Sequence, residues 1–226
     1  MKHCAFGLMF AGLVLSATSV SATPYTNQAL FNAAASAAGT LSIETFDSYA
    51  TGQQVSSLPA LGIQFDPLAG SGLYPVAWPV LNCGGGISSS PNALLNSSVC
   101  AIPPGGQGDI VFRPIVVPYG VIAVGFFNAS TDDSLTLSFY NGADQLIESY
   151  SVGGGAPAFV GIVAAQAAAK FTIHAFGGNG LFALDNLQVA IAVRSDAPEP
   201  ATAAALFTGL ALFGAIRRRR VTPSSR

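Results

Sequence analysis

Short strand-forming runs separated by turn signals fill the chain from residue 109 to residue 191, and this pattern most limits how the chain can fold. Residues 121–127 form a nearly unbroken apolar run, typical of a central strand that is covered on both faces. Residues 134–139 alternate strictly between polar and apolar side chains. Asn141-Gly142 follows as a hairpin turn signal. The pattern predicts an all-β fold.

The remaining strands are less regular but continue the same pattern. The alanine-rich residues 164–169 could form a short helical turn, but they lack a cap and the length of a helix. Roughly eight to ten strands at short, even spacing indicate an antiparallel β-sandwich of the jelly-roll type. The other predicted strands are residues 41–43, 62–65, 109–113, 145–152, 159–163, 170–176 and 181–191.

The C-terminal segment has a different character. Residues 201–216 contain no charged side chain, and a cluster of four arginines follows them: Arg217, Arg218, Arg219 and Arg220. A helix of that length spans about 24 Å, and arginine stems that reach the headgroups could bridge the rest of the ~30 Å hydrocarbon core. The arginines would mark the cytoplasmic end. We therefore expect a transmembrane helix with a stop-transfer cluster; a buried core helix is the alternative.

Pro198, Glu199 and Pro200 stand directly before this apolar run. Two prolines keep such a segment extended, so that it can enter a protease cleft. The order of this motif, an apolar helix and an arginine cluster resembles the PEP-CTERM sorting signal of Gram-negative bacteria. The resemblance implies export, retention at the inner membrane and processing by an exosortase, a membrane-embedded cysteine transpeptidase. It covers only residues 198–226 and implies no biochemical activity.

The N-terminus agrees with export. Lys2 precedes an apolar run over residues 4–15, and Val20-Ser21-Ala22 is a plausible signal-peptidase site. We therefore predict a signal helix and peptide over residues 1–22, a β-sandwich ectodomain over 23–196 and a sorting signal over 197–226. The expected partners are the Sec machinery, signal peptidase and exosortase. The product would be anchored transiently in the inner membrane and then lie at the cell surface or outside the cell.

Two cysteines remain after signal removal, Cys83 and Cys100, within a proline- and glycine-rich stretch over residues 67–108. In an oxidising compartment we expect them to form a disulfide. Closing that loop would stabilise the fold by roughly 3 kcal/mol in the chain-entropy picture.

The middle of the chain resembles the jelly-roll ectodomains often attached to PEP-CTERM tails. This likeness implies a lectin-like sandwich without an assigned reaction, and it does not cover the long stretch 67–108. The segments that carry it are Thr45-Phe46-Asp47, residues 89–94, residues 159–162 and residues 183–187.

The charge of the predicted ectodomain is strongly one-sided. Residues 23–196 hold three lysines and arginines against ten carboxylates, although the whole chain carries a formal net charge of −2. With no basic patch to neutralise phosphates, the composition argues against binding to nucleic acid or to anionic membranes.

Asp185 is the first candidate for a metal site. It shares the inward phase of the last strand, where an ionised carboxylate needs hydrogen bonds or a cation. First and last strands often pair in a jelly roll, which would bring Glu44 or Asp47 close to it. Three such groups suit a structural Ca²⁺, which prefers oxygen ligands. Alternatively, Asp185 accepts backbone N–H bonds at a bulge.

Aromatic side chains in loops suggest a carbohydrate site. Trp78, which is the single tryptophan of the chain, and Tyr74 are the leading candidates, with Tyr119 as a helper. Sugars stack their C–H faces on aromatic rings. Alternatively, Trp78 simply anchors a long loop to the sandwich.

Enzyme motifs do not appear in the sequence. It contains no nucleophile elbow, phosphate loop, dinucleotide fingerprint or HExxH. A Ser-His-Asp triad would need His174, which is expected to face solvent. We therefore predict a non-catalytic exported surface or extracellular-matrix protein associated with exopolysaccharide in a biofilm. The alternatives are a lectin-like carbohydrate-binding module and a secreted polysaccharide-degrading enzyme, whose two carboxylates nothing singles out.

Overall fold

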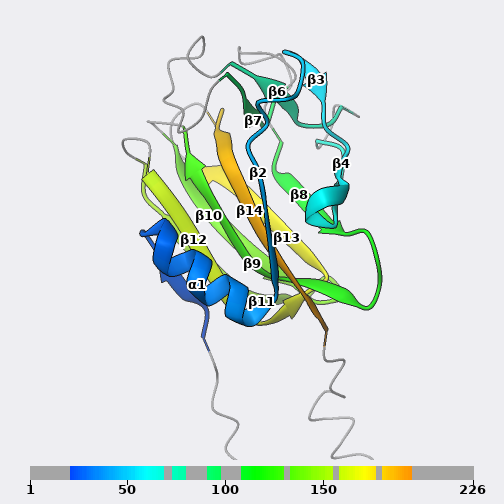
Figure 1. Ribbon diagram of the computed structural model, residues 1–226, viewed down its shortest axis with the longest axis vertical. Helices are drawn as coiled ribbons and strands as arrows, with labels where there is room; N and C mark the ends of the chain where they lie inside the picture. Colours follow the sequence, from blue (N-terminus) through cyan, green and yellow to red (C-terminus); the bar gives the residue numbers. More distant parts are fainter. Residues whose placement is uncertain are drawn as a thin grey trace, which may run out of the picture.

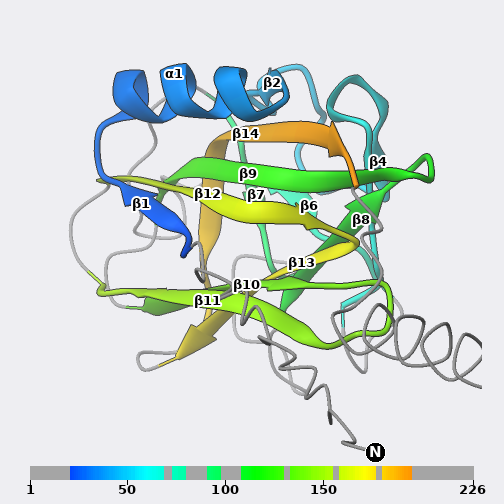
Figure 2. The same cartoon turned by 90° about the horizontal axis from the view of Figure 1, so that it is seen from below.

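Two antiparallel β-sheets face each other, and a helix covers the outer side of the larger one (Figures 1 and 2). The computed structural model describes residues 21–68, 73–79, 91–97, 108–129, 133–154, 158–176 and 180–194. Every pairing between its strands is antiparallel, as the turn-separated pattern predicted. The β-sandwich is therefore confirmed for this part of the chain.

The larger sheet has eight strands in the order β1-β12-β9-β14-β7-β6-β3, with β2 paired to β14 beside β7. Strand β14 therefore changes neighbours along its length, from β7 at its start to β2 further on. The strands are β1 (Thr23–Tyr25), β2 (Thr40–Glu44), β3 (Gln53–Gln54), β6 (Val76–Trp78), β7 (Ala93–Leu95), β9 (Tyr119–Asn128), β12 (Ala158–Ala168) and β14 (Ala183–Val193).

The smaller sheet has six strands in the order β11-β10-β13-β8-β5-β4. Its inner face carries a row of phenylalanines on adjacent strands, with ring centroids 4.7 to 5.8 Å apart, and these fill the space between the sheets: Phe65, Phe112, Phe171 and Phe139. The strands are β4 (Ser57–Leu58), β5 (Ile63–Phe65), β8 (Ile110–Pro114), β10 (Ser134–Tyr140), β11 (Leu146–Val152) and β13 (Lys170–Phe176). A 3₁₀ turn, η1 (Pro59–Leu61), connects β4 to β5.

Helix α1 (Gln28–Ala38) covers the outer face of the larger sheet, where it contacts β12, β9, β2 and β14. Asn27 caps it, since its side chain accepts a hydrogen bond from the backbone N–H of Leu30 at 3.0 Å. This helix was not predicted from the sequence. Its signals were the Asn27 cap and eleven residues without proline or glycine. Strand β9 is indeed covered on both faces, as predicted, and α1 provides the second cover.

Two paired glycines allow the helix to approach the sheet. Gly125 of β9 lies opposite Gly161 of β12, and the buried ring of Phe31 packs over both. A methyl group on Gly161 would lie 2.5 Å from a ring carbon of Phe31, and one on Gly125 would lie 2.7 Å from another. The sheet thus accepts the helix only where side chains are absent.

The suggested helical turn at residues 164–169 is wrong. Strand β12 continues to Ala168, and β13 begins two residues later. Ala168 pairs with Val121 across an irregularity in the ladder, and the N–H of Ala165 donates to a carboxylate oxygen of Glu148 at 3.0 Å. These long-range hydrogen bonds override the weak helical preference of a short alanine run.

We call the end of the sandwich where β9 begins and β14 ends its base, and the opposite end its far end. In Figure 1 the base is at the bottom. Among the described residues, no helix is long and apolar enough to cross a membrane. The predicted signal helix, Cys83, Cys100, the motif at Pro198–Pro200, the predicted span 201–216 and the arginine cluster lie outside the described residues.

Candidate binding site

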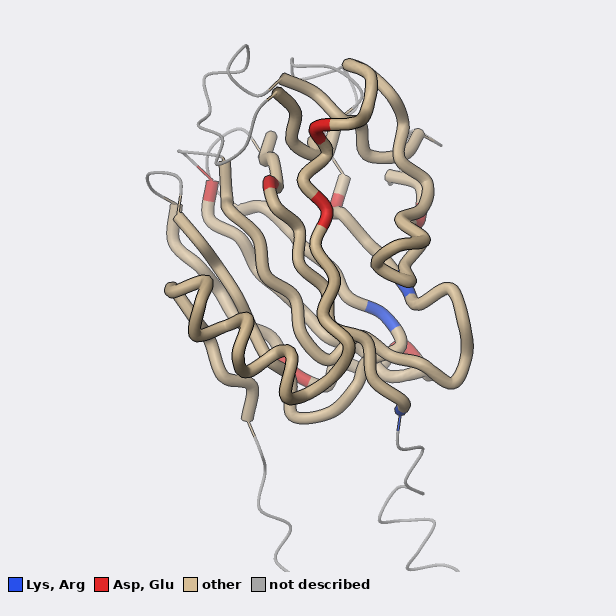
Figure 3. The backbone as a smooth tube through the Cα atoms, in the orientation of Figure 1, with Lys and Arg blue, Asp and Glu red and all other residues tan. Residues whose placement is uncertain are grey.

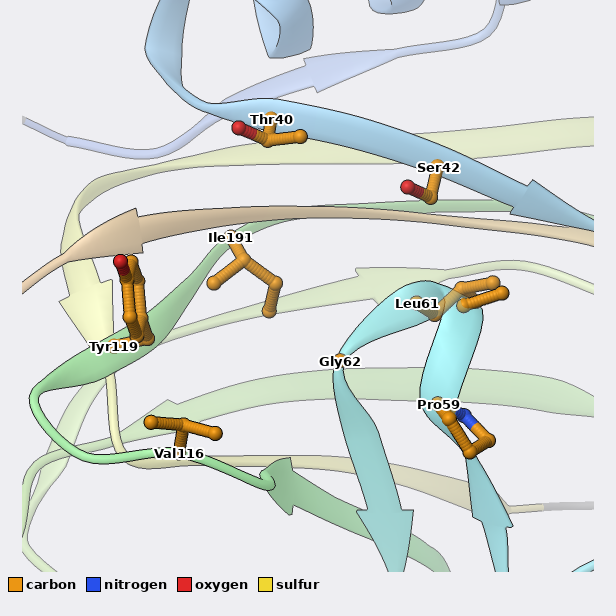
Figure 4. A pocket seen from close by; sticks show the side chains of 9 residues that line it. Thr40, Ser42, Pro59, Leu61, Gly62, Val116, Tyr119 and Ile191 are labelled. Atoms are coloured by element: carbon orange, nitrogen blue, oxygen red, sulfur yellow. The ribbon is translucent and has the colours of Figure 1, made fainter.

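A pocket of about 280 Å³ opens at the base, between β2, η1 and the loop that joins β8 to β9 (Figure 4). Small, apolar and hydroxyl-bearing side chains surround it, and none of them carries a charge. In Figure 4, Thr40 and Ser42 lie on one side and Val116 on the other, with Ile191 and Tyr119 between them. The full lining is Thr40, Ser42, Pro59, Ala60, Leu61, Gly62, Val116, Tyr119 and Ile191.

Backbone hydrogen bonds fix three separate segments around this pocket. The N–H of Ile115 donates to the carbonyl oxygen of Gly62 at 2.8 Å, which ties the β8–β9 loop to the end of η1. Gly62 itself has a φ of 68°, a left-handed conformation that suits glycine. The N–H of Tyr119 donates to the carbonyl oxygen of Val116 at 3.1 Å and turns the chain into β9. The pocket is therefore built on hydrogen-bonded elements.

Tyr119 gives the pocket its aromatic surface. Its side chain is 43% exposed, and it is the first residue of β9, opposite Val193 of β14. Thr40 of β2 pairs with Ile191 on the edge of β14 opposite to β9. The hydroxyl of Thr40 and the apolar side chain of Ile191 therefore face the same pocket. An apolar wall with a few hydroxyl groups and one open ring is the usual composition of a small-molecule site.

The structure separates Tyr119 from the other two predicted sugar-binding aromatics. Trp78 ends β6 and pairs with Ala93 in the far half, level with the last residues of β9. It packs, half-buried, against a second core cluster, and its buried Nε1 has no hydrogen-bond partner among the described residues. Tyr74 is half-buried against the main core. These positions favour the alternative in which Trp78 anchors a loop. The cluster consists of Val76, Ala93, Leu95, Ala129 and Ala183.

The predicted calcium ligands are not gathered into a cluster of three within the described residues. Strands β2 and β14 pair as expected, with Glu44 opposite Leu187. However, no three histidine, cysteine or acidic side chains of the described residues, which include Glu44, Asp47 and Asp185, are grouped so that they could hold a metal ion. Glu44 accepts the N–H of Phe46 at 2.9 Å instead.

The surroundings of Asp185 agree with the alternative, in which its carboxylate accepts backbone N–H bonds at a bulge. It is fully buried at a break in the ladder between β14 and β9, and its carboxylate accepts the N–H of Asn186 at 2.7 Å. Asn186 has a φ of 52°, as expected where a bulge turns the chain. The buried carboxylate of Asp185 therefore serves as a hydrogen-bond acceptor for the backbone at this bulge.

His174 is exposed on the outer face of the smaller sheet, as predicted. Its Nδ1 lies 2.7 Å from a carboxylate oxygen of Asp109, which directly precedes the neighbouring strand β8. Neither residue lines the pocket at Tyr119.

Ion pairs at the base involve two of the described cations. Arg113 contacts Asp66 at 3.1 Å, and Lys170 contacts Asp144 at 2.7 Å and lies 4.3 Å from the ring centre of Tyr140. The hydrogen bond from Lys170, its positive charge and that of Arg113 hold the pKa of Asp144 below its usual value.

The similarities between this chain and known proteins are distant. No protein-family model matches the sequence, and no curated protein matches it. Eleven chains of solved structures match. One is the K2 cleaved adhesin domain of Lys-gingipain, with 15% identity over 67% of this chain and 99% of that one, at a TM-score of 0.43.

Two further matches are more distant still. A point mutant of CBM29-2, a family 29 carbohydrate-binding module, is 12% identical over 67% of this chain and 91% of that one, at a TM-score of 0.39. An α-L-arabinofuranosidase, MgGH51, is 13% identical over 65% of this chain and 25% of that one, at a TM-score of 0.38. At these scores the function must be argued from the residues themselves.

Sequence reasoning found Tyr119 but missed the rest of its pocket. Ser42 was placed on a strand without a role, and Thr40, η1 and Val116 were not singled out. The pocket joins four segments that are far apart in the chain, so no local pattern contains it. The local signals were Pro59 and Gly62, which predict a turn, and the apolar residues 115–117, which follow a strand without entering the next one.

Proposed function

We propose that the sandwich is a non-catalytic, lectin-like carbohydrate-binding module whose site is the pocket at Tyr119. The observation that carries this proposal is a half-exposed aromatic ring beside the hydroxyls of Thr40 and Ser42 in one pocket. A sugar ring offers C–H groups to the tyrosine face and hydroxyls to the side chains around it. The volume lies near the lower end for small-molecule sites, which suits one sugar residue of a chain.

The composition of the pocket argues for binding and against hydrolysis. Glycoside hydrolysis needs two carboxyl groups that flank the scissile bond. No carboxylate and no histidine line this pocket. The absence of cations from its lining, together with the acidic character of the ectodomain, favours a neutral glycan over an acidic one.

The sequence supplies the setting of this proposed activity. We propose that the chain is exported, held in the inner membrane by residues 201–216 with arginines 217–220, and processed by an exosortase near Pro198–Pro200. The product would act at the cell surface or in the exopolysaccharide matrix. The jelly-roll connectivity and the disulfide between Cys83 and Cys100 belong to the same proposal.

Replacing Tyr119 tests the carbohydrate site. Neutral hexasaccharides (cellohexaose, xylohexaose and mannohexaose) are titrated into the wild type by calorimetry to find a ligand. We expect Tyr119→Ala to weaken binding about five- to tenfold, because roughly 1 kcal/mol of stacking is lost. Tyr119→Phe keeps the ring and should bind nearly as well as the wild type.

Trp78→Ala is the matched control at the far end. It should lower thermal stability, since Trp78 packs on a core cluster, but it should leave glycan affinity unchanged. The proposal is wrong if Tyr119→Ala binds as tightly as the wild type, or if Trp78→Ala alone loses binding.

A further inference from the structure

The loop between β8 and β9 exposes a group of large apolar side chains at the base. Val117 is 76% exposed and Ile115 is 42% exposed, and Val193 at the end of β14 is 64% exposed. The N–H of Arg194 donates to the carbonyl oxygen of Pro118 at 2.9 Å, so this loop and the end of β14 lie together. Ile115, Val117 and Val193 form what we call the apolar tip. None of the three lines the pocket at Tyr119.

The charges of the described residues are divided between the two ends (Figure 3). All described lysines and arginines lie toward the base: Arg113 in β8, Lys170 at the start of β13 and Arg194 after β14. Two carboxylates, Asp144 and Glu148, lie near them, and Asp66 forms an ion pair with Arg113. The far half holds only negative charge among the described residues: Glu44, Asp47, Asp109, Asp133 and Asp185. The base is therefore close to neutral, whereas the far half would be repelled by an anionic surface.

The chain continues from this same end toward the predicted membrane span. Six residues, 195–200, separate Arg194 from the apolar run that begins at Ala201. Fully extended, that connection reaches at most about 25 Å. Strand β9 alone, which runs from the base to the far end, is about 30 Å long. A connection shorter than the domain excludes an upright orientation in which the far end faces the bilayer and the base points away from it.

We infer that the apolar tip rests on the lipid bilayer in the membrane-anchored precursor. This inference rests on the anchoring part of the proposed function. Ile115, Val117 and Val193 enter the interfacial region, where exposed apolar side chains are favoured over water. The uneven charge keeps the acidic far half, and with it Trp78, away from anionic headgroups. The lack of a basic patch disfavours electrostatic binding to anionic membranes, whereas the contact proposed here depends on the apolar tip.

One consequence concerns the pocket. Val116 and Tyr119, which line the pocket, are chain neighbours of Val117, so the site lies beside the bilayer surface before processing. Cleavage near Pro198–Pro200 would free the base, and with it the approach of a large glycan to Tyr119.

Lipid quenching of tryptophan emission tests this orientation. The full chain with Val117→Trp is reconstituted into vesicles of phosphatidylglycerol and phosphatidylcholine, and the phosphatidylcholine carries brominated acyl chains. We expect the brominated lipid to quench the introduced tryptophan but to leave the emission of the wild type, which comes from Trp78 alone, unchanged. Phe176→Trp, at a 43% exposed position in the far half, is the matched control and should not be quenched. Val193→Trp is a second probe of the tip and should be quenched.

The outcomes separate the inference from the proposal beneath it. If the full chain floats with the vesicles but neither tip probe is quenched, or if Phe176→Trp is quenched equally, the orientation is wrong and the anchor stands. The emission of the tip probes could instead change with protein concentration and not with brominated lipid. That result would indicate that a second copy of the chain covers the apolar tip, and it would also overturn the inference. If the full chain does not float at all, the anchoring itself is wrong, and the inference fails with it.

Discussion

Tyr119 differs from Tyr74 and Trp78 in its surroundings more than in its chemistry. Tyr74 and Trp78 are packed on core clusters, whereas Tyr119 stands at a strand end with an open ring face. The sequence shows three aromatic residues near prolines and cannot rank them, since their exposure depends on which segments pack beside them. It selected aromatic residues as candidates, and the structure decides which of them faces a pocket.

At the same scale, Asp144 makes a pH-dependent contribution to stability. Its folded-state pKa is lowered, first by the hydrogen bond from Lys170 and then by the charges of Lys170 and Arg113. The contribution is therefore present above the pKa of the carboxyl in the unfolded chain and is lost as the pH falls through the lower folded pKa.

Asp144→Asn tests this contribution. We expect the variant to be less stable than the wild type at neutral pH, and the difference in free energy of unfolding to disappear in acid. Since Asp144 is exposed, added salt should reduce the difference at neutral pH. Urea unfolding at several pH values measures it. A difference that stays constant down to strongly acidic pH would contradict the account.

At the scale of elements, strands were predictable and the helix was not. Residues 134–139 and the Asn141-Gly142 turn carry a period-two pattern and a turn signal, and the structure has β10, a turn and β11 there. Helix α1 was missed because its apolar side is mostly alanine, which leaves a weak helical period. Strand β12 was predicted too short because its last residues are alanines held by neighbouring strands.

The packing of α1 on the larger sheet depends on the two glycines beneath Phe31. We expect Gly161→Ala to lower the free energy of unfolding by about 1–3 kcal/mol, because the added methyl would lie 2.5 Å from the ring of a fully buried residue. Gly153→Ala is the matched control, since nothing lies within 4 Å of a methyl there, and it should change stability little. Denaturant unfolding measures both.

A double variant tests whether the ring of Phe31 causes the cost of Gly161→Ala. Phe31→Ala removes the ring, so that adding Gly161→Ala to it should cost much less than Gly161→Ala alone. Equal costs in the two backgrounds would show that the glycine is needed for some other reason.

At the scale of the whole molecule, the two ends of the sandwich differ in composition. The base combines the pocket, the apolar tip and the described cations, and the far end carries carboxylates and the packed tryptophan. The sequence predicted the sandwich and the pairing of residues 41–43 with the last strand, which places Glu44 opposite Leu187. It offered both a calcium site and a backbone bulge for Asp185 and could not choose between them, because the choice depends on the local path of β14 against β9.

The central claim is that a neutral glycan binds at the base, and one spectrum can test it. In a ¹⁵N-labelled sample the single tryptophan gives one indole N–H signal, which reports on the far end. When a hexasaccharide that binds is titrated in, the backbone signals of Val116, Val117 and Tyr119 should shift while the indole signal stays in place. A shift of the indole signal without any change in the signals of residues 116–119 would contradict the account.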